Sequence, residues 1–243
     1  IVLLHDSLGC VELWRDFPTR LARAVGRPVI AYDRLGFGRS DAHPGLLEKD
    51  FVRQEARGGF ATILERFQFD RFLMLGHSVG GGMAVSIASA YPDRCCGVVT
   101  ESAQAFVEDC TLEGIRAARK SFAGPGQLDR LRKYHGEKAA WVLSAWTETW
   151  LAPEFANWNL DGELRKVLCP LLAIHGDQDE YGTIRHPERI VSLAGESAES
   201  VLLTGCGHVP HREQEQAVLD AVARFVRNPP RRRNESRSAS GTA

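Results

Sequence analysis

The stretch FLMLGHSVG, residues 72–80, decides the fold predicted for this chain. Its first five residues are apolar or small, as in a buried strand, and residues 80–91 have helical spacing. Between them, residues 76–80 (GHSVG) have the G-x-S-x-G pattern of a sharp strand-to-helix turn. Side chains at the two glycine positions would collide with neighbouring backbone, and the serine is held in a strained conformation. We therefore predict that Ser78 is a nucleophile.

Short apolar runs alternate with longer segments of helical spacing on both sides of this turn. This alternation is typical of a parallel sheet with crossover helices, and continuous apolar runs indicate strands that are buried on both faces. The predicted strands cover residues 1–5, 29–33, 72–76, 97–101, 171–175 and 200–203, and the predicted helices cover 14–25, 51–67, 80–91 and 214–226. The sequence therefore predicts an α/β fold with a mostly parallel sheet flanked by helices.

The alternation stops between residues 103 and 165, where helical spacing continues without a strand pattern. Four of the five tryptophans of the chain lie there, namely Trp141, Trp146, Trp150 and Trp158. We interpret this segment as a helical cap inserted over the C-terminal edge of the sheet, with Trp146 and Trp150 as substrate-binding residues. Ordinary helices packed on the side of the sheet are the alternative, because aromatic clusters often belong to a core.

The cap prediction divides the chain into four parts. Residues 1–102 and 166–228 form the two parts of a core, and 103–165 form the cap. Residues 229–243 contain no apolar residue larger than proline or alanine, so we expect a disordered tail. The chain begins at Ile1, inside a predicted strand and without a methionine, so we expect that earlier strands are missing and that any signal peptide would lie outside it.

Composition excludes several classes of partner. The chain has 243 residues with 30 basic and 31 acidic side chains, a balance that favours neither nucleic acid nor an anionic membrane surface. It has no apolar run of the roughly 18 residues that a membrane span needs. The six cysteines have neither CxxC nor zinc-ligand spacing, which indicates reduced thiols and a cytoplasmic location. A homodimer is compatible with the sequence.

A serine hydroxyl becomes a strong nucleophile only when a base takes its proton. On a fold with this turn, the base is a histidine that follows the last strand. His208 lies in the loop after the predicted strand 200–203, and His211, at the start of the final helix, is the competing candidate. A metal site formed by these two histidines would lack a third ligand nearby, so we expect no metal and no cofactor.

The base requires an acidic partner that orients its ring and stabilises its protonated form. Asp177 and Asp179 follow the predicted strand 171–175, and either could reach the loop of His208. Glu101, at the end of the strand 97–101, is a third candidate. The residues alone leave this choice open.

An oxyanion formed during acyl transfer needs backbone donors. One donor should be the N–H of Val79, the residue after the nucleophile. We assign the second to the N–H of Ser7, in the loop after the first predicted strand. The side chain of Asp6 would repel an oxyanion, so we expect it to point away.

The ordered motifs resemble the α/β-hydrolase superfamily, of the esterase and C–C hydrolase type with a helical cap. They are the loop 5–9, the D-x-x-G-x-G-x-S turn at 33–40, the turn at Ser78, the segment 176–179 and Gly207-His208, and the resemblance spans residues 1–228. In that family the acid is commonly three residues after the glycine that ends its strand, which implies Asp179, with Asp177 bracing the turn. The turn at 33–40 is structural in the family. Asp6 departs from the family, which usually has glycine there.

The resemblance implies a cofactor-free serine hydrolase acting on a small, mainly apolar or aromatic carbonyl substrate, above all a carboxylic ester. Hydrolysis of a carbon–carbon bond in a vinylogous 1,5-diketone is the alternative, for which Arg116, Arg119 and Tyr134 are candidate polar groups of the cap. A perhydrolase side activity and a ligand receptor without turnover also remain open. Epoxide hydrolases and dehalogenases of this fold use aspartate where this chain has Ser78.

Overall fold

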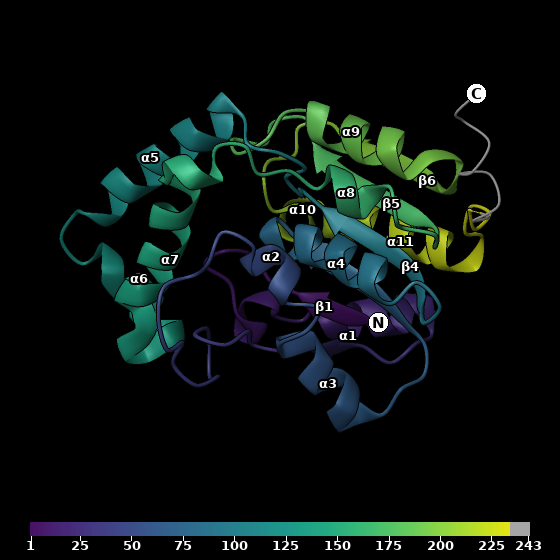
Figure 1. The fold of residues 1–243 in the computed structure, drawn as a ribbon, viewed down its shortest axis with the longest axis horizontal. Coiled ribbons are helices and arrows are strands. Elements are labelled where there is room, and N and C mark those ends of the chain that lie inside the picture. The colour runs from purple at the N-terminus through teal and green to yellow at the C-terminus, as the bar shows by residue number, and fades with distance from the viewer. Residues whose placement is uncertain (234–243) are drawn as a thin grey trace.

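The computed structural model describes residues 1–233, which contain a six-stranded sheet whose neighbouring strands are all parallel. The strand order is β2-β1-β3-β4-β5-β6. The strands are β1 (Val2–Leu4), β2 (Ile30–Ala31), β3 (Phe72–His77), β4 (Cys95–Glu101), β5 (Leu171–Gly176) and β6 (Ala198–Leu203). Helices lie on both sides of this sheet (Figure 1). The architecture agrees with the predicted α/β fold class.

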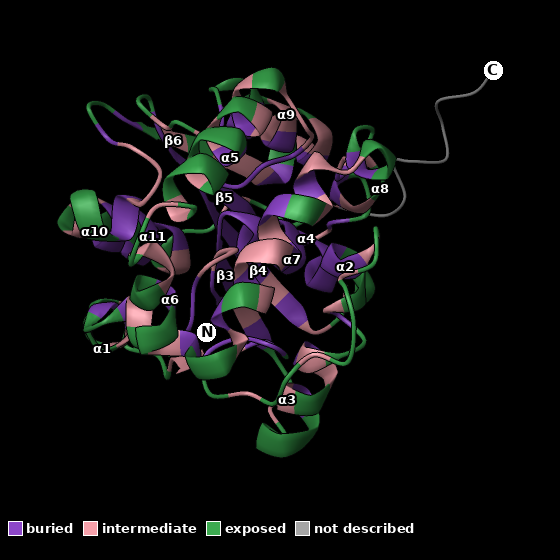
Figure 2. Ribbon diagram, turned by 90° about the vertical axis from the view of Figure 1, so that its left-hand side faces the viewer, coloured by how far each residue is buried: buried purple, intermediate pink, exposed green. Residues whose placement is uncertain are grey.

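The central strands are apolar throughout because each of their faces contributes to a separate core. Leu3, Leu75 and Val99 belong to one core, which α1 (Phe17–Val25) and α11 (Glu215–Arg227) complete. Side chains at the alternate positions point to the opposite core, since successive residues of a strand face opposite ways. Figure 2 shows the buried residues along the strands and the exposed ones on the outer turns of the helices.

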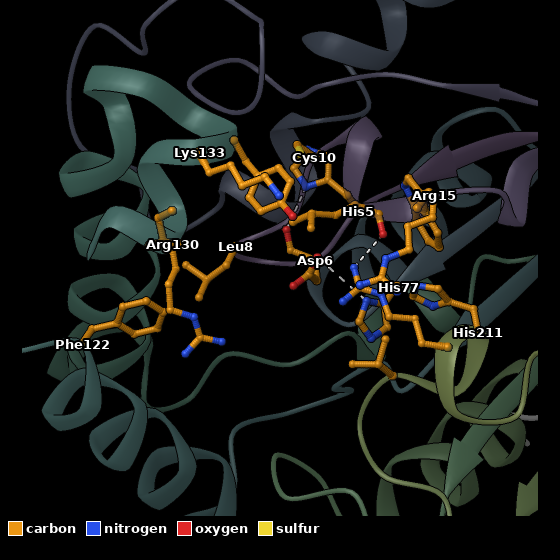
Figure 3. A pocket seen from close by; sticks show the side chains of 16 residues that line it. His5, Asp6, Leu8, Cys10, Arg15, His77, Phe122, Arg130, Lys133 and His211 are labelled. Carbon is orange, nitrogen blue, oxygen red and sulfur yellow. Dashed lines mark hydrogen bonds and ion pairs between the residues drawn. The ribbon is translucent and has the colours of Figure 1, made fainter. Parts of the chain in front are cut away.

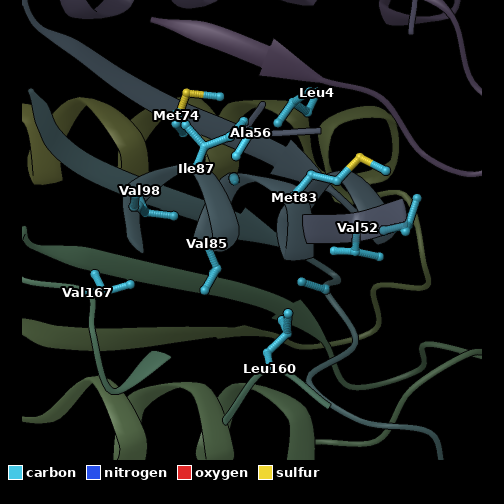
Figure 4. Close-up of a cluster of buried hydrophobic side chains, with 14 of the residues drawn as sticks. Leu4, Val52, Ala56, Met74, Met83, Val85, Ile87, Val98, Leu160 and Val167 are labelled. Atoms are coloured by element: carbon cyan, nitrogen blue, oxygen red, sulfur yellow. The ribbon is translucent and has the colours of Figure 1, made fainter. Parts of the chain in front are cut away.

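The second core surrounds α4 (Val79–Ala90), the helix that follows the nucleophile turn. Every residue from Val79 to Ala88 is buried, so the helix is apolar all round instead of amphipathic. Met83 and Ile87 lie among side chains of strands and neighbouring helices (Figure 4). The helices on this side are α2 (Phe51–Gln54), α3 (Gly59–Phe67), α8 (Asp161–Leu164) and α9 (Arg185–Ala194).

Two predicted helices are each interrupted in the structure. The predicted helix 51–67 divides into α2 and α3 at Gly58, whose backbone is not helical, and the adjacent glycines of this turn favour a break. The predicted helix 14–25 begins as the 3-10 turn η1 (Val11–Trp14), and α1 starts afresh at Phe17. Pro18 accounts for this break, because proline fits the first turn of a helix but clashes with the carbonyl four residues earlier.

One strand is shorter than predicted, and one helix is present that the sequence analysis did not predict. The predicted strand 29–33 is reduced to Ile30–Ala31, at the edge of the sheet. The helix α9 had not been predicted, although His186, Ile190 and Ala194 repeat at helical spacing and are buried. Pro187 lies in its first turn, where a proline is tolerated, and it obscures the helix in the sequence.

The segment between β4 and β5 consists mainly of helices. It contains α5 (Asp109–Phe122), α6 (Gln127–His135), η2 (Gly136–Lys138), α7 (Ala139–Leu151), η3 (Pro153–Phe155) and α8. Figure 1 shows α5, α6 and α7 grouped at one side of the molecule, apart from the helices that flank the sheet. The elements η4 (Gly195–Ser197) and α10 (Pro210–Glu213) complete the described chain. The division into core, cap and tail stays a prediction.

The first residues of the predicted tail contact the rest of the protein. The backbone N–H of Arg233 donates a hydrogen bond of 3.0 Å to the carbonyl of Leu168. The remainder of that prediction, from residue 234 onward, lies outside the described residues. Within residues 1–233, no helix combines the length and the apolar character needed to cross a bilayer.

The turn at 33–40 is held together by one carboxylate. Asp33 accepts hydrogen bonds from the backbone N–H of Val11 at 2.6 Å and of Arg39 at 2.8 Å, and the Ser40 hydroxyl donates to its carbonyl at 2.6 Å. A Cβ at Gly38 would lie 2.2 Å from the Asp33 carboxyl carbon, so only glycine fits there. The motif therefore has the structural role that the family resemblance implied.

The burial of the strands gives a stability test. Leu172 in β5 is 0% exposed, whereas Leu202 in the adjacent β6 is 51% exposed. Leu172→Ala should lower the free energy of unfolding by about 2–5 kcal/mol, because it removes buried methyl groups and leaves a cavity. Leu202→Ala should change it by less than about 1 kcal/mol. Urea unfolding measures both variants, and equal losses would contradict the described core.

Candidate active site

Ser78 lies between β3 and α4 in a strained backbone conformation. Its φ of 55° and ψ of −125° are unusual for a residue with a side chain. A Cβ on Gly76 would lie 2.0 Å from the Gly80 carbonyl oxygen, and a Cβ on Gly80 would lie 2.3 Å from that of Leu4. The Ser78 N–H donates a 2.8 Å hydrogen bond to the Glu101 carbonyl, which ties the turn to β4. The turn thus has the steric basis that the sequence predicted.

His208 is oriented by a carboxylate. Its Nδ1 lies 2.8 Å from Oδ1 and 2.9 Å from Oδ2 of Asp179, whose side chain is 0% exposed. A carboxylate only accepts hydrogen bonds, so Nδ1 carries the proton and Nε2 is left as an acceptor. The backbone N–H of Tyr181 donates a hydrogen bond of 2.8 Å to Oδ1 of Asp179.

The two partners stabilise each other's charged forms. Burial lowers the pKa of His208, but the hydrogen bond and the charge of Asp179 outweigh it, so the pKa lies above its ordinary value. Burial raises the pKa of Asp179, but the hydrogen bond and charge of His208, together with the Tyr181 N–H, outweigh it, so that pKa lies below its ordinary value. Asp179 therefore remains a carboxylate when His208 gains a proton.

The competing acids of the sequence analysis have other partners. Asp177 accepts a 2.7 Å hydrogen bond from the Gly205 N–H, so it braces the loop that leads to His208. Glu101 is 0% exposed, and its Oε2 lies 2.9 Å from Nδ1 of His211. His211, the competing histidine, is thus held in a buried pair of its own.

Ser78 and His208 line one cavity of about 230 Å³. Its other lining residues are Asp6, Ser7, Leu8, Gln104, Thr111, Ile115, Trp146, Trp150, Glu180, Tyr181 and Val209. The Ser78 hydroxyl donates a long hydrogen bond of 3.4 Å to Oε1 of Gln104, its partner among the described residues. Its hydroxyl is therefore not directed at His208 in this conformation.

The predicted oxyanion donors lie near each other. Ser7 and Val79 both line a small cavity of about 10 Å³, together with Trp146 and Trp150. Neither backbone N–H donates a hydrogen bond within residues 1–233. Val79 is the first residue of α4, where unpaired N–H groups and the helix dipole favour negative charge.

Asp6 lies beside the cavity, in the loop that begins with His5. Its Oδ1 is 4.0 Å from Nδ1 of His77, and a Cβ on Gly9 would overlap it. His5 holds this loop, because its Nδ1 lies 2.8 Å from the Asp6 carbonyl while its Nε2 accepts from the Arg34 N–H at 3.2 Å. The Asp6 side chain therefore lies toward His77, on a wall that the Ser78 cavity shares with a neighbouring cavity.

The four tryptophans of the helical segment have different surroundings. Trp146 and Trp150 line the Ser78 cavity. Trp158 is buried and stacks on Phe155, with ring centres 5.3 Å apart. Trp141 donates its ring N–H to the Gly45 carbonyl at 2.8 Å. Only the first pair is thus placed to contact a molecule bound beside Ser78.

The predicted polar groups of the cap do not gather in this cavity. Arg116 and Arg119 are absent from its lining, and Tyr134 lines a neighbouring cavity. The sequence analysis missed Gln104 and Tyr181. Both follow the carboxyl ends of strands, where sites form in parallel sheets, and that position was the available signal.

Tyr181 connects the aromatic wall to the base. Its ring centre lies 4.8 Å from that of His208 and 5.9 Å from that of Trp146, both with edge-on geometry. The Tyr181 ring thus packs against the imidazole of His208 and against the aromatic wall. Within residues 1–233, no group of three or more His, Cys, Asp or Glu side chains could hold a metal ion.

Comparison with known proteins places this geometry in a family. Residues 1–221 match the model of the alpha/beta hydrolase family. Epoxide hydrolase B of Mycobacterium tuberculosis is 33% identical over 99 residues, which are 41% of this chain and 27% of that protein. Proline iminopeptidase of Lactobacillus acidophilus is 28% identical over 164 residues, 65% of this chain and 50% of that protein. The matching segments thus span half or less of these curated relatives.

A solved structure shows the same fold. The esterase RhEst1 from Rhodococcus superposes with a TM-score of 0.72 at 21% identity, over 94% of this chain and 90% of that one. At this identity the likeness concerns the fold alone.

The pairing of His208 with Asp179 predicts a titration. In Asp179→Asn the raising contribution of the carboxylate is lost while burial still disfavours the imidazolium, so the pKa of His208 should fall. NMR titration of the His208 ring measures it. Asp177→Asn is the matched control, because Asp177 bonds to Gly205, and it should leave the titration in place. An unchanged pKa in Asp179→Asn would show that the pair does not exist in solution.

Proposed function

Because the chain belongs to the alpha/beta hydrolase family, we propose that it is a serine hydrolase that cleaves small carboxylic esters through an acyl-enzyme on Ser78. The observation that carries the proposal is the shared cavity, into which the strained Ser78 and the Asp179-bound His208 both open. A nucleophile, a base and an orienting acid are what such chemistry requires.

In the proposed reaction the Ser78 hydroxyl leaves Gln104 and turns to Nε2 of His208, which takes its proton as the oxygen attacks the ester carbonyl. Catalytic hydrogen bonds are often long or misdirected in a free enzyme and shorten when substrate binds. His208 then protonates the leaving alcohol, and an acyl-enzyme remains. A water molecule, activated by His208, releases the acid and restores the serine.

The tetrahedral oxyanion of both steps accepts hydrogen bonds from the N–H groups of Val79 and Ser7. Their lack of other partners supports this role, and one such donor contributes on the order of 10²–10³ in rate. The Asp6 Oδ1 lies 4.0 Å from Nδ1 of His77, and the proposal gives this carboxylate no part in binding the oxyanion.

The raised pKa of His208 gives the reaction a pH dependence. The protonated imidazolium cannot accept the serine proton, so activity should fall as the pH drops through the His208 pKa. The buried Asp179 has a lowered pKa and stays ionised over that range.

An apolar or aromatic group of the substrate would contact Trp146, Trp150 and Ile115, which line the cavity beside Ser78. The six cysteines, none of them in a disulfide, support a reducing, cytoplasmic location.

Hydrolysis of a carbon–carbon bond in a vinylogous diketone uses the same three residues, Ser78, His208 and Asp179, and is the second candidate. The epoxide hydrolase activity of the relative does not fit the serine at position 78.

The role of Ser78 is tested by labelling with a fluorophosphonate probe and by ester hydrolysis. The parent should gain one adduct by intact mass, and Ser78→Ala should gain none and lose about 10⁴-fold or more in kcat/KM. Ser86→Ala is the control, because Ser86 is a buried serine of α4 whose hydroxyl donates to the Gly82 carbonyl. A folded parent without adduct would contradict the proposal and favour a receptor without turnover, whereas turnover of a diketone but not of esters would select the second candidate.

The aromatic wall is tested by Trp146→Ala. Loss of the ring should lower kcat/KM for aryl-substituted esters relative to acetate esters by about tenfold, because aromatic contacts and buried area are lost. Trp141→Ala removes a tryptophan of the same helix that lies outside the cavity, and it should keep the parent preference. An unchanged preference in Trp146→Ala would show that this wall does not contact substrate.

A further inference from the structure

A second cavity, of about 480 Å³, adjoins the Ser78 cavity. Asp6, Leu8 and Val209 line both of them, so the two share a wall. Figure 3 shows the larger cavity between the α5 and α6 side chains on one side and Arg15, His77 and His211 on the other. A molecule that occupied both cavities would pass between these three residues.

The second cavity concentrates positive charge in a nearly neutral protein. Arg15, Arg130, Lys133 and Arg212 line it, and Asp6 is the single carboxylate among its lining residues. The whole chain has 30 basic and 31 acidic side chains, so this excess is local. We name this site the basic cavity.

None of the four cations lies within ion-pair distance of a carboxylate in residues 1–233. Arg130 donates to the side-chain oxygen of Gln127 at 3.2 Å, and Lys133 lies 5.1 Å from the ring centre of Tyr134. Arg212 donates to the Leu13 carbonyl at 2.6 Å. By contrast, Arg132 of the same helix α6 pairs with Asp129 at 2.7 Å. The four cations around the cavity thus have no carboxylate partner within ion-pair distance among these residues.

The remaining walls increase the effect of these charges. Trp14 and Leu131 are buried apolar residues of the lining, and low-dielectric walls focus an electrostatic field into a cleft. Burial lowers the pKa of His5, and it lowers that of His77 to about 4, so both are neutral at pH 7. The positive charge available to a ligand therefore belongs to the arginines and the lysine.

We propose that the basic cavity binds a carboxylate or phosphate group of the same substrate whose carbonyl reacts at Ser78. This inference rests on the proposed ester hydrolysis and narrows its substrate to an anionic ester with an apolar part beside Trp146 and a charged end in the basic cavity. Arginine forms paired hydrogen bonds to either anion, and lysine adds a point charge.

The experiment compares matched esters. In the first series, the acyl group carries the charge: nitrophenyl monoesters of glutaric, adipic and suberic acids are compared with nitrophenyl esters of neutral acyl chains of equal length. In the second series, the carboxylate is on the leaving phenol. Rates are measured for the parent, Arg130→Gln, Lys133→Gln and the control Arg132→Gln. All three side chains are on α6 and exposed, so the fold should tolerate each change.

The parent should prefer the anionic ester in one of the two series. Arg130→Gln and Lys133→Gln should each lower the ratio of kcat/KM for anionic over neutral esters by about fivefold, mainly through KM, because an exposed charge pair is worth up to about 1 kcal/mol. Arg132→Gln should keep the parent ratio. The preference should also weaken as salt is added.

Calorimetry with glutarate and with inorganic phosphate provides a readout without turnover. Either anion should bind the parent more tightly than the double variant Arg130→Gln/Lys133→Gln, and the tighter of the two identifies the preferred group. Equal ester ratios in all variants together with equal anion binding would overturn the basic cavity while leaving Ser78 hydrolysis intact. Binding that depends on these cations in a protein that hydrolyses no ester would instead overturn the proposed function alone.

Discussion

The backbone crossing at the nucleophile turn is the steric constraint on which the rest of the active site depends. Gly80 lies against the carbonyl of Leu4, and Gly76 lies against the carbonyl of Gly80, so any side chain at either position would overlap backbone atoms. This close approach seats α4 directly on the sheet. It also holds Ser78 at a positive φ, with its N–H bonded to β4. The strained backbone conformation of Ser78 persists because the packing around α4 leaves the chain no other conformation at this turn.

A second requirement is that His208 and His211, three residues apart, are held by two different carboxylates. Asp179 holds His208 at the cavity, and Glu101 holds His211 behind it. The His77 ring contacts the rings of both His208 and His211, and its Nε2 is 2.7 Å from the His208 carbonyl. Asp179 and Glu101 thus each have a hydrogen-bonded partner, as charges in a low dielectric require.

The differences between predicted and observed elements have local causes. The predicted strands lie close to the observed ones, because burial on both faces requires a continuous apolar run that is easily recognised in the sequence. Helix boundaries were less accurate, since Gly58 and Pro18 interrupt segments whose apolar spacing continues through them. The reverse holds for α9, where Pro187 suggests a break but occupies the first turn of a regular helix.

The sequence by itself determined the α/β class, the turn at Ser78 and the set of histidines and acids that could serve it. These features depend on short-range sterics and on the period of apolar residues, and both can be recognised in the sequence. Only the tertiary structure decided that Asp179 meets His208 while Glu101 meets His211, because such pairs join residues far apart in sequence. The basic cavity is likewise tertiary, since Arg15 and Lys133 come to line one cavity only when α6 packs beside the loop after β1.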